Sequence, residues 1–188
     1  QVVYEKLYAA YGPQGWWPGE SRLEIIVGAV LTQNTSWANV ERAIDNLRDA
    51  DLLSPDKLFA AGREELAELI RPAGYFRLKA GRLINLLADI MDTYVGSRDA
   101  MFATDFHALR EQLLSVNGIG PETADSILLY AAELPAFVVD TYTARVLKRH
   151  GWIEKQADYD SLQSYFTDAL PQDVPLFNEF HALFVRVG

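Results

Sequence analysis

Residues 114–140 read LSVNGIGPETADSILLYAAELPAFVVD, and this stretch predicts two helices joined by a tight turn. Gly118 and Gly120 bracket Ile119, and a strongly helical run follows over residues 122–132. Glycine permits a positive φ and the close approach of another backbone, while the first amides of a helix are free to bind an anion such as phosphate. The unit therefore suits contact with the backbone of one nucleic-acid strand, without reading its bases.

A single carboxylate follows this hairpin. After Pro135 the chain reads Val138-Val139-Asp140 and opens a further helix, expected over 141–150. Aspartate is a common helix N-cap, and without the hairpin upstream capping would be the better interpretation of Asp140. The carboxylate nevertheless follows closely on a predicted phosphate-binding turn, which favours a part in chemistry on a bound strand.

The order of hairpin, helix, Val-Val-Asp and helix resembles that of the base-excision DNA glycosylases that include endonuclease III. A second match, GAVLTQNT at residues 28–35, lies where these enzymes carry the end of a helix that wedges into DNA. The resemblance extends over nearly the whole chain. It implies an all-α fold of two helical lobes with a DNA cleft between them.

One lobe is expected over residues 20–133, with the helix-hairpin-helix at about 106–132, and the other combines 1–19 with 134–188. No segment shows sustained period-two alternation, so we expect no sheet. Apolar spacing and start and stop signals predict the helices. They are expected at 2–11, 22–33, 37–48, as two short helices within 54–70, as a long helix after 75, and at 104–114, 141–150, 158–169 and 174–187.

The composition, with 49% apolar and 23% charged residues, is that of a soluble globular protein. No apolar run approaches the length that spans a bilayer, so we expect a cytoplasmic, nucleoid-associated bacterial protein and no membrane partner. The 188 residues contain no cysteine, which excludes disulfides, thiolate zinc sites and a thiolate-bound iron–sulfur cluster within them.

The net charge of -9 opposes binding to nucleic acid, since affinity for phosphates comes largely from Lys and Arg. A glycosylase needs only a local positive surface, and several basic residues fall in segments able to flank the hairpin and the aspartate. These are Arg77, Lys79, Arg82, Arg145, Lys148 and Arg149. We therefore expect a monomer that binds damaged double-stranded DNA modestly and in a salt-sensitive way.

The resemblance also implies roles for single residues. It makes Asp140 the catalytic carboxylate, which stabilises a cation-like sugar and orients or deprotonates the attacking water. It makes Gln33 the side chain that enters the duplex, whereas helix capping alone would explain Asn34 or Thr35. The expected DNA-binding residues are Gln33, Asn34, Asn117, Gly118, Ile119, Gly120 and Thr123.

An aromatic slot for a flipped base is expected from Trp16, Trp17 and Trp37, although each tryptophan taken alone could be a core plug. Glu122 completes the expected base pocket. Bifunctional members of the family carry a lysine in its place, and a carboxylate cannot form an imine with the sugar. The resemblance thus implies a monofunctional enzyme. Glu122 is either a favourable acid in the first turn of a helix or a contact to the lesion.

The substrate expected from the resemblance is an alkylated purine. Mismatch adenine glycosylases keep a general-acid glutamate at the position that Gly28 occupies here. A cationic base such as 3-methyladenine needs no such acid, and an aromatic slot attracts it through cation–π interaction. Trp16-Trp17-Pro18, LTQNT and GIGPETAD resemble most the bacterial 3-methyladenine DNA glycosylase III branch. The alternatives are a glycosylase for another damaged base and a non-catalytic damaged-DNA-binding protein.

Relatives also imply a K⁺ or Na⁺ ion at the hairpin, on the backbone carbonyls of Leu114, Val116 and Ile119. No catalytic metal is expected, because no cluster of His, Asp or Glu stands out. The three histidines lie far apart in the sequence and are expected to be structural or surface residues. They are His107, His150 and His181.

Overall fold

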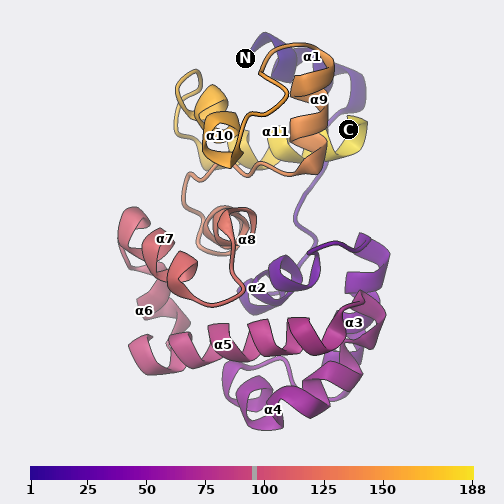
Figure 1. The fold of residues 1–188 in the computed structure, drawn as a ribbon, viewed down its shortest axis with the longest axis vertical. Helices are drawn as coiled ribbons and strands as arrows, with labels where there is room; N and C mark the ends of the chain where they lie inside the picture. The colour runs from indigo at the N-terminus through magenta and orange to yellow at the C-terminus, as the bar shows by residue number, and fades with distance from the viewer. Residues whose placement is uncertain (95–96) are drawn as a thin grey trace. The chain divides into compact units, whose positions relative to one another are not determined.

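The protein is built of helices in a computed structural model that describes residues 1–94 and 97–188 (Figure 1). Within these ranges there is no β-strand, so the expected all-α class is confirmed. The chain forms two compact units, one of Gly19–Ile127 and the other of Gln1–Pro18 with Leu128–Gly188. The predicted division near residue 133 lies later than this boundary, which falls inside the π-helical turn η2, Ile127–Ala131.

The unit Gly19–Ile127 holds the hairpin. In it α5 packs along α4, α2 contacts α3 and α5, and α7 packs against α8 (Figure 1). Gly62 has a φ of 75° inside α4, so two helices meet there, in agreement with the two short helices predicted within 54–70. The helices are α2 Arg22–Leu31, α3 Trp37–Asp49, α4 Pro55–Leu69, the 3-10 turn η1 Arg71–Ala73, α5 Phe76–Tyr94, α6 Arg98–Phe102, α7 Phe106–Ser115 and α8 Pro121–Ser126.

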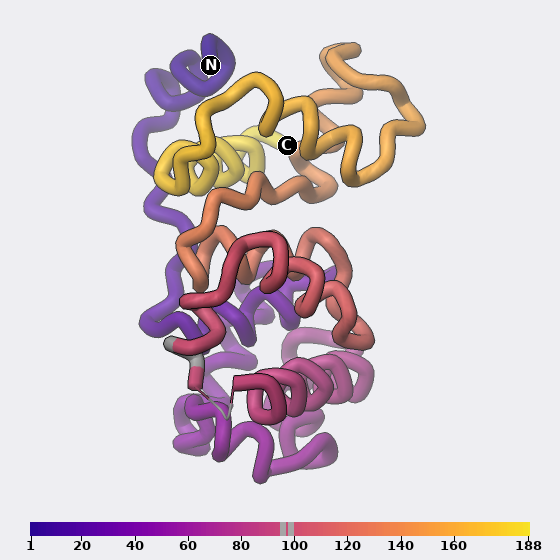
Figure 2. The backbone as a smooth tube through the Cα atoms, turned by 90° about the vertical axis from the view of Figure 1, so that its left-hand side faces the viewer, coloured from indigo at the N-terminus to yellow at the C-terminus, as the bar shows by residue number. Residues whose placement is uncertain are grey.

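The other unit carries the aspartate. Its helices are α1 Val2–Tyr11, α9 Thr141–Arg149, α10 Tyr159–Thr167 and α11 Val174–Val187. Helix α11 packs on α9 and on α1, and Figure 2 shows α1 beside α11. An aromatic core joins these elements. The Phe137 and Phe166 rings stack at 4.0 Å, and those of Phe180 and Phe184 stack at 4.8 Å.

Polar caps fix the starts of many helices. Side chains of Ser21, Ser54, Asp105, Asp140, Asp158 and Asp173 each accept a backbone amide of the first turn. Among the helices described, none is long and apolar enough to cross a bilayer.

Lys79 is a core residue, which corrects its expected place on a basic surface. Its side chain is 1% exposed, and Nζ donates to the carbonyls of Leu31, at 2.8 Å, and Ala73, at 2.7 Å. Burial, with a smaller contribution from Arg82, lowers the pKa of Lys79 to about 8. Lys79 thus ties the C-terminal end of α2 to the turn before α5, and it positions the segment that carries Gln33.

Candidate nucleic-acid site and catalytic carboxylate

The hairpin turn between α7 and α8 is closed by the amide of Ile119, which donates to the carbonyl of Val116 at 3.0 Å. Only Gly118 has a left-handed φ, of 98°, whereas Gly120 is extended at −95° and is the N-cap of α8. A Cβ at residue 118 would overlap Cγ of Arg82, whereas one at residue 120 would meet nothing within 4 Å. Backbone conformation and close packing therefore both require glycine at 118 only.

An ion pair clamps the two hairpin helices together. Arg110 donates through Nε to Oδ1 of Asp125 at 2.7 Å, and through NH2 to Oδ2 at 3.1 Å. Asp125 is fully buried and Ile119 is 5% exposed, so the hairpin is anchored in the core of its unit. The carbonyl of Asn117 accepts the side-chain amide of Asn85 at 3.0 Å.

Gln33 lies against the hairpin, although 85 and 90 residues separate it from its partners there. Its Nε2 donates to Oγ1 of Thr123 at 2.8 Å and reaches the carbonyl of Gly118 at 3.4 Å. Its Oε1 accepts the guanidinium of Arg82. The fold thus brings together Gln33, Gly118 and Thr123, three of the predicted DNA-binding residues, on one unit.

Capping does not explain Asn34 or Thr35. The N-cap of α3 is Ser36, and no side chain caps this helix end. Asn34 is exposed with a φ of 53°, and Oγ1 of Thr35 accepts the side chain of Asn39 at 3.1 Å. The capping interpretation is therefore wrong.

Asp140 is the N-cap of α9, and its carboxylate is 12% exposed. Oδ1 accepts the amide of Thr143 at 2.7 Å, and Oδ2 lies 3.5 Å from Nε2 of His181. Burial opposes ionisation, but the nearby His181 ring, together with the Thr143 amide, holds the pKa of Asp140 below its ordinary value. Capping and a catalytic role are thus compatible, because each uses the ionised carboxylate.

His181 is the residue that the sequence did not single out. It lies on α11, is 5% exposed, and its Nδ1 is hydrogen-bonded to the hydroxyl of Tyr130. The sequence predicts a structural or surface residue, and the burial of His181 agrees with a structural one. The fold also places its ring beside Asp140. Only tertiary packing of α11 against α9 joins residues so far apart in the sequence.

The expected base-pocket residues divide between the two units. The Trp16 and Trp17 rings lie 5.2 Å apart, and the ring of Trp17 lies 5.1 Å from that of Tyr130. Trp37 is the first residue of α3, half-buried, and Glu122 is exposed in the first turn of α8. Their assembly into one slot stays a prediction.

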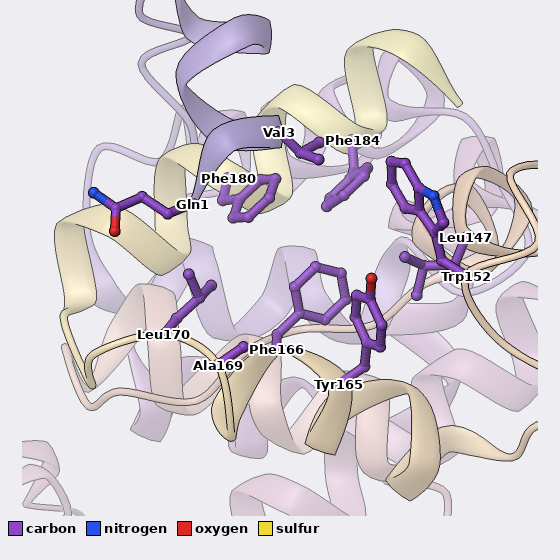
Figure 3. Close-up of a pocket in the computed structure, with 10 residues that line it drawn as sticks. All are labelled: Gln1, Val3, Leu147, Trp152, Tyr165, Phe166, Ala169, Leu170, Phe180 and Phe184. Carbon is purple, nitrogen blue, oxygen red and sulfur yellow. The ribbon is translucent and has the colours of Figure 1, made fainter.

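A separate, largely apolar pocket of about 250 Å³ opens on the unit that carries Asp140 (Figure 3). Rings from α10 and α11 point into it, and none of the predicted site residues lines it. Its lining is Gln1, Val3, Leu147, Trp152, Tyr165, Phe166, Ala169, Leu170, Phe180 and Phe184.

The hairpin carbonyls are compatible with the predicted monovalent ion. The Val116 carbonyl accepts one amide and keeps a second lone pair for a cation. Binding of K⁺ or Na⁺ by Leu114, Val116 and Ile119 stays a prediction. Among the described residues no group of three His, Asp or Glu side chains is placed to hold a metal ion.

Comparison with known proteins identifies the class. The family model of the HhH-GPD superfamily of base excision DNA repair proteins matches residues 27–172, so the chain belongs to this family and is a DNA glycosylase. A candidate DNA repair glycosylase of Methanocaldococcus jannaschii is 50% identical over 186 residues, which cover 98% of this chain and 84% of that protein.

Solved structures agree with this class. The structure of 3-methyladenine DNA glycosylase MagIII of H. pylori, bound to 1,N6-ethenoadenine, matches with a TM-score of 0.85 and 32% identity, covering 98% of this chain and 94% of that one. A covalent endonuclease III–DNA complex matches with a TM-score of 0.83 and 23% identity over 97% of this chain and 82% of that chain, which shows a shared fold. The resemblance inferred from the hairpin is thereby confirmed.

Proposed function

We propose that this protein is a monofunctional glycosylase that hydrolyses the N-glycosidic bond of alkylated purines, such as 3-methyladenine, in duplex DNA. The observation that carries the proposal is Asp140, a nearly buried carboxylate whose pKa lies below its ordinary value and whose Oδ1 is fixed by the Thr143 amide. Such a group suits a reaction in which positive charge develops on a sugar.

In the proposed reaction the nucleotide leaves the duplex, and the bond between C1′ of the sugar and the base nitrogen breaks with its electron pair going to the base. The Asp140 carboxylate stabilises the cation-like sugar and orients a water molecule, whose oxygen bonds to C1′ while one of its protons passes to the carboxylate and from there to solvent. An alkylated purine is already cationic and leaves as a neutral base. It therefore needs no acid to protonate it.

The absence of a suitable general acid on α2 supports an alkylated purine as the substrate. Gly28 occupies that position, and the only carboxylate of α2, Glu24, is 5% exposed. Glu24 accepts the amide of Glu20 at 2.8 Å and pairs with Arg48 at 3.0 Å. These interactions hold both carboxylate oxygens of Glu24 within the protein.

The distribution of lysines supports hydrolysis without strand cleavage. Glu122 replaces the lysine of bifunctional relatives, and Lys79 is held by two backbone carbonyls. Lys148 lies on α9, eight residues after Asp140, which corresponds to about 12 Å of helix rise. Lys148 is therefore too far along α9 to form an imine beside Asp140.

The test is release of free base from N-methylated duplex DNA by the wild-type protein, Asp140→Asn and Asp158→Asn. Asp158 is the matched control, because it is also an N-cap aspartate and Asn caps helices equally well. We expect 3-methyladenine release by the wild type and Asp158→Asn, and a loss of about 100-fold or more in Asp140→Asn. The DNA strands should stay intact until alkali is added.

Other outcomes would contradict defined parts of the proposal. A covalent adduct trapped by borohydride would show imine chemistry and a bifunctional enzyme. Release of oxidised pyrimidines in place of alkylated purines would overturn the substrate class. Tight binding of lesion duplexes with no base release would show a damage-recognition protein in which Asp140 is a helix cap.

A further inference from the structure

The two oxygens of the Asp140 carboxylate have different neighbours. Oδ1 accepts a backbone amide within its own helix, that of Thr143 at 2.7 Å. Oδ2 faces Nε2 of His181, a side chain of another helix, at 3.5 Å. Capping fixes the first oxygen only, so the rotation of the carboxylate about its own axis depends on the second contact.

The hydroxyl of Tyr130 is the hydrogen-bond partner of Nδ1 of His181. Burial, assisted by the charges of Asp140 and Glu179, raises the pKa of Tyr130 well above its ordinary value, so the phenol keeps its proton. Its O–H can then donate to Nδ1 of His181. When Nδ1 accepts in this way, Nε2, the atom that faces Asp140, carries a ring proton.

Nε2 of His181 is buried and makes no hydrogen bond within normal limits to any described residue. The Oδ2 atom of Asp140 is thus the acceptor available to it, at a distance somewhat longer than a normal hydrogen bond. Catalytic hydrogen bonds are often long in the absence of substrate and tighten when it binds. Glu179, the other charged group acting on this array, accepts the backbone amide of Gln14 at 2.6 Å.

We propose that His181, with its tautomer set by Tyr130, is a positioning residue that orients the Asp140 carboxylate for attack of water on the sugar. The proposal rests on the proposed glycosylase function. It also connects the carboxylate to the predicted base platform, because the Tyr130 ring that holds His181 lies 5.1 Å from the ring of Trp17. Tyr130 and His181 touch neither base nor sugar in this role.

Four variants separate positioning from packing. His181→Phe keeps a ring but removes the donor, and His181→Gln returns an N–H near the place of Nε2. Tyr130→Phe keeps the ring beside Trp17 and removes only the hydroxyl. The matched control is His107→Phe, at an exposed position on α7.

The first measurement is the single-turnover rate of 3-methyladenine release at saturating enzyme, beside the affinity for DNA that carries a stable abasic-site analogue. We expect His181→Phe to be about 10- to 100-fold slower, with the affinity unchanged within about 3-fold. His181→Gln should recover most of the rate, and Tyr130→Phe should be slowed less than His181→Phe. A wild-type rate in His181→Phe would show that His181 only packs.

The second measurement needs no substrate. An NMR titration of the Asp140 side-chain carbon should show a higher midpoint in His181→Phe than in the wild type, while His107→Phe leaves it unchanged. An unchanged midpoint in His181→Phe would overturn the proposed contact. If the midpoint rises but the wild-type protein releases no alkylated purine, the proposed function fails and the His181–Asp140 contact stands.

Discussion

Replacing Lys79 with methionine tests the buried ammonium that fixes the end of α2. The change keeps the length of the side chain but leaves the carbonyls of Leu31 and Ala73 without their donor. An unsatisfied buried polar group costs about 1 to 3 kcal/mol, so two carbonyls represent about 2 to 6 kcal/mol. At neutral pH the wild-type amine is charged, and burial of this charge destabilises the folded state. Replacing it with methionine removes that cost and so offsets part of the loss.

The pH dependence separates these two effects. The pKa of Lys79 falls from 10.5 in the unfolded chain to about 8 in the folded protein. Between these values the unfolded state binds more protons, so the free energy of unfolding of the wild type rises with pH. From about pH 7 to about pH 9.5 the rise is at most about 2 kcal/mol, and solvent screening reduces it to about 1 to 2 kcal/mol.

The neutral amine retains two N–H groups for the two carbonyls, so deprotonation removes the cost of the charge without removing the hydrogen bonds. The stability difference between wild type and Lys79→Met should therefore widen by about 1 to 2 kcal/mol over this range. Urea unfolding followed by circular dichroism at several pH values measures it, with the exposed Lys155→Met as control. A difference that is constant or narrows with rising pH would refute the assignment of a charged, desolvated Lys79.

Gly118→Ala should lower the free energy of unfolding by about 2 kcal/mol and weaken DNA binding, because a side chain at positive φ is strained. Gly120→Ala should change the free energy of unfolding by less than about 0.5 kcal/mol. Equal effects of the two variants in urea unfolding would contradict this. Asp125→Asn should cost about 3 kcal/mol, because it removes the buried charge that pairs with the guanidinium of Arg110, and thermal unfolding should show it. Since the folded pKa of Asp140 is lowered, its stabilising contribution is complete above the unfolded value of about 3.9 and disappears as the pH falls through the folded value. The wild type should thus lose more stability than Asp140→Asn between about pH 5 and about pH 2.5, and parallel losses in the two proteins would show an unshifted carboxyl.

Much of the fold could be predicted from local signals. Such signals act within a few residues of themselves, so they mark helix ends without knowledge of the fold. Examples are the N-caps Ser21 and Ser54, the break at Gly62 and the hairpin glycines. The short helix α6 and the exact boundary between the units were not predicted. The boundary lies within a continuously buried run, so no change of polarity marks it.

The site was harder to predict, because its contacts are tertiary. Lys79 lies four residues before Leu83 on the apolar stripe of α5, and this position was the one available sign that its side chain enters the core. The proximity of His181 and Asp140 had no such sign, since neither spacing nor composition links α11 to the start of α9. Asn34 failed as a cap because the chain adopts a left-handed turn there and Ser36 takes the N-cap position.

The contacts of Gln33 have a consequence for how the protein distinguishes lesions from normal DNA. If Gln33 enters the duplex, as the family resemblance implies, it must first leave Thr123 and Arg82. Two hydrogen bonds at about 1 kcal/mol each hold the extended side chain to a minor population of about 3%. Apparent affinity would then fall about 30-fold for every duplex. A weakly paired base costs less to extrude, so a lesion would offset more of this loss than an intact base pair. The resting position of one glutamine would thus add to the cost of entering any duplex.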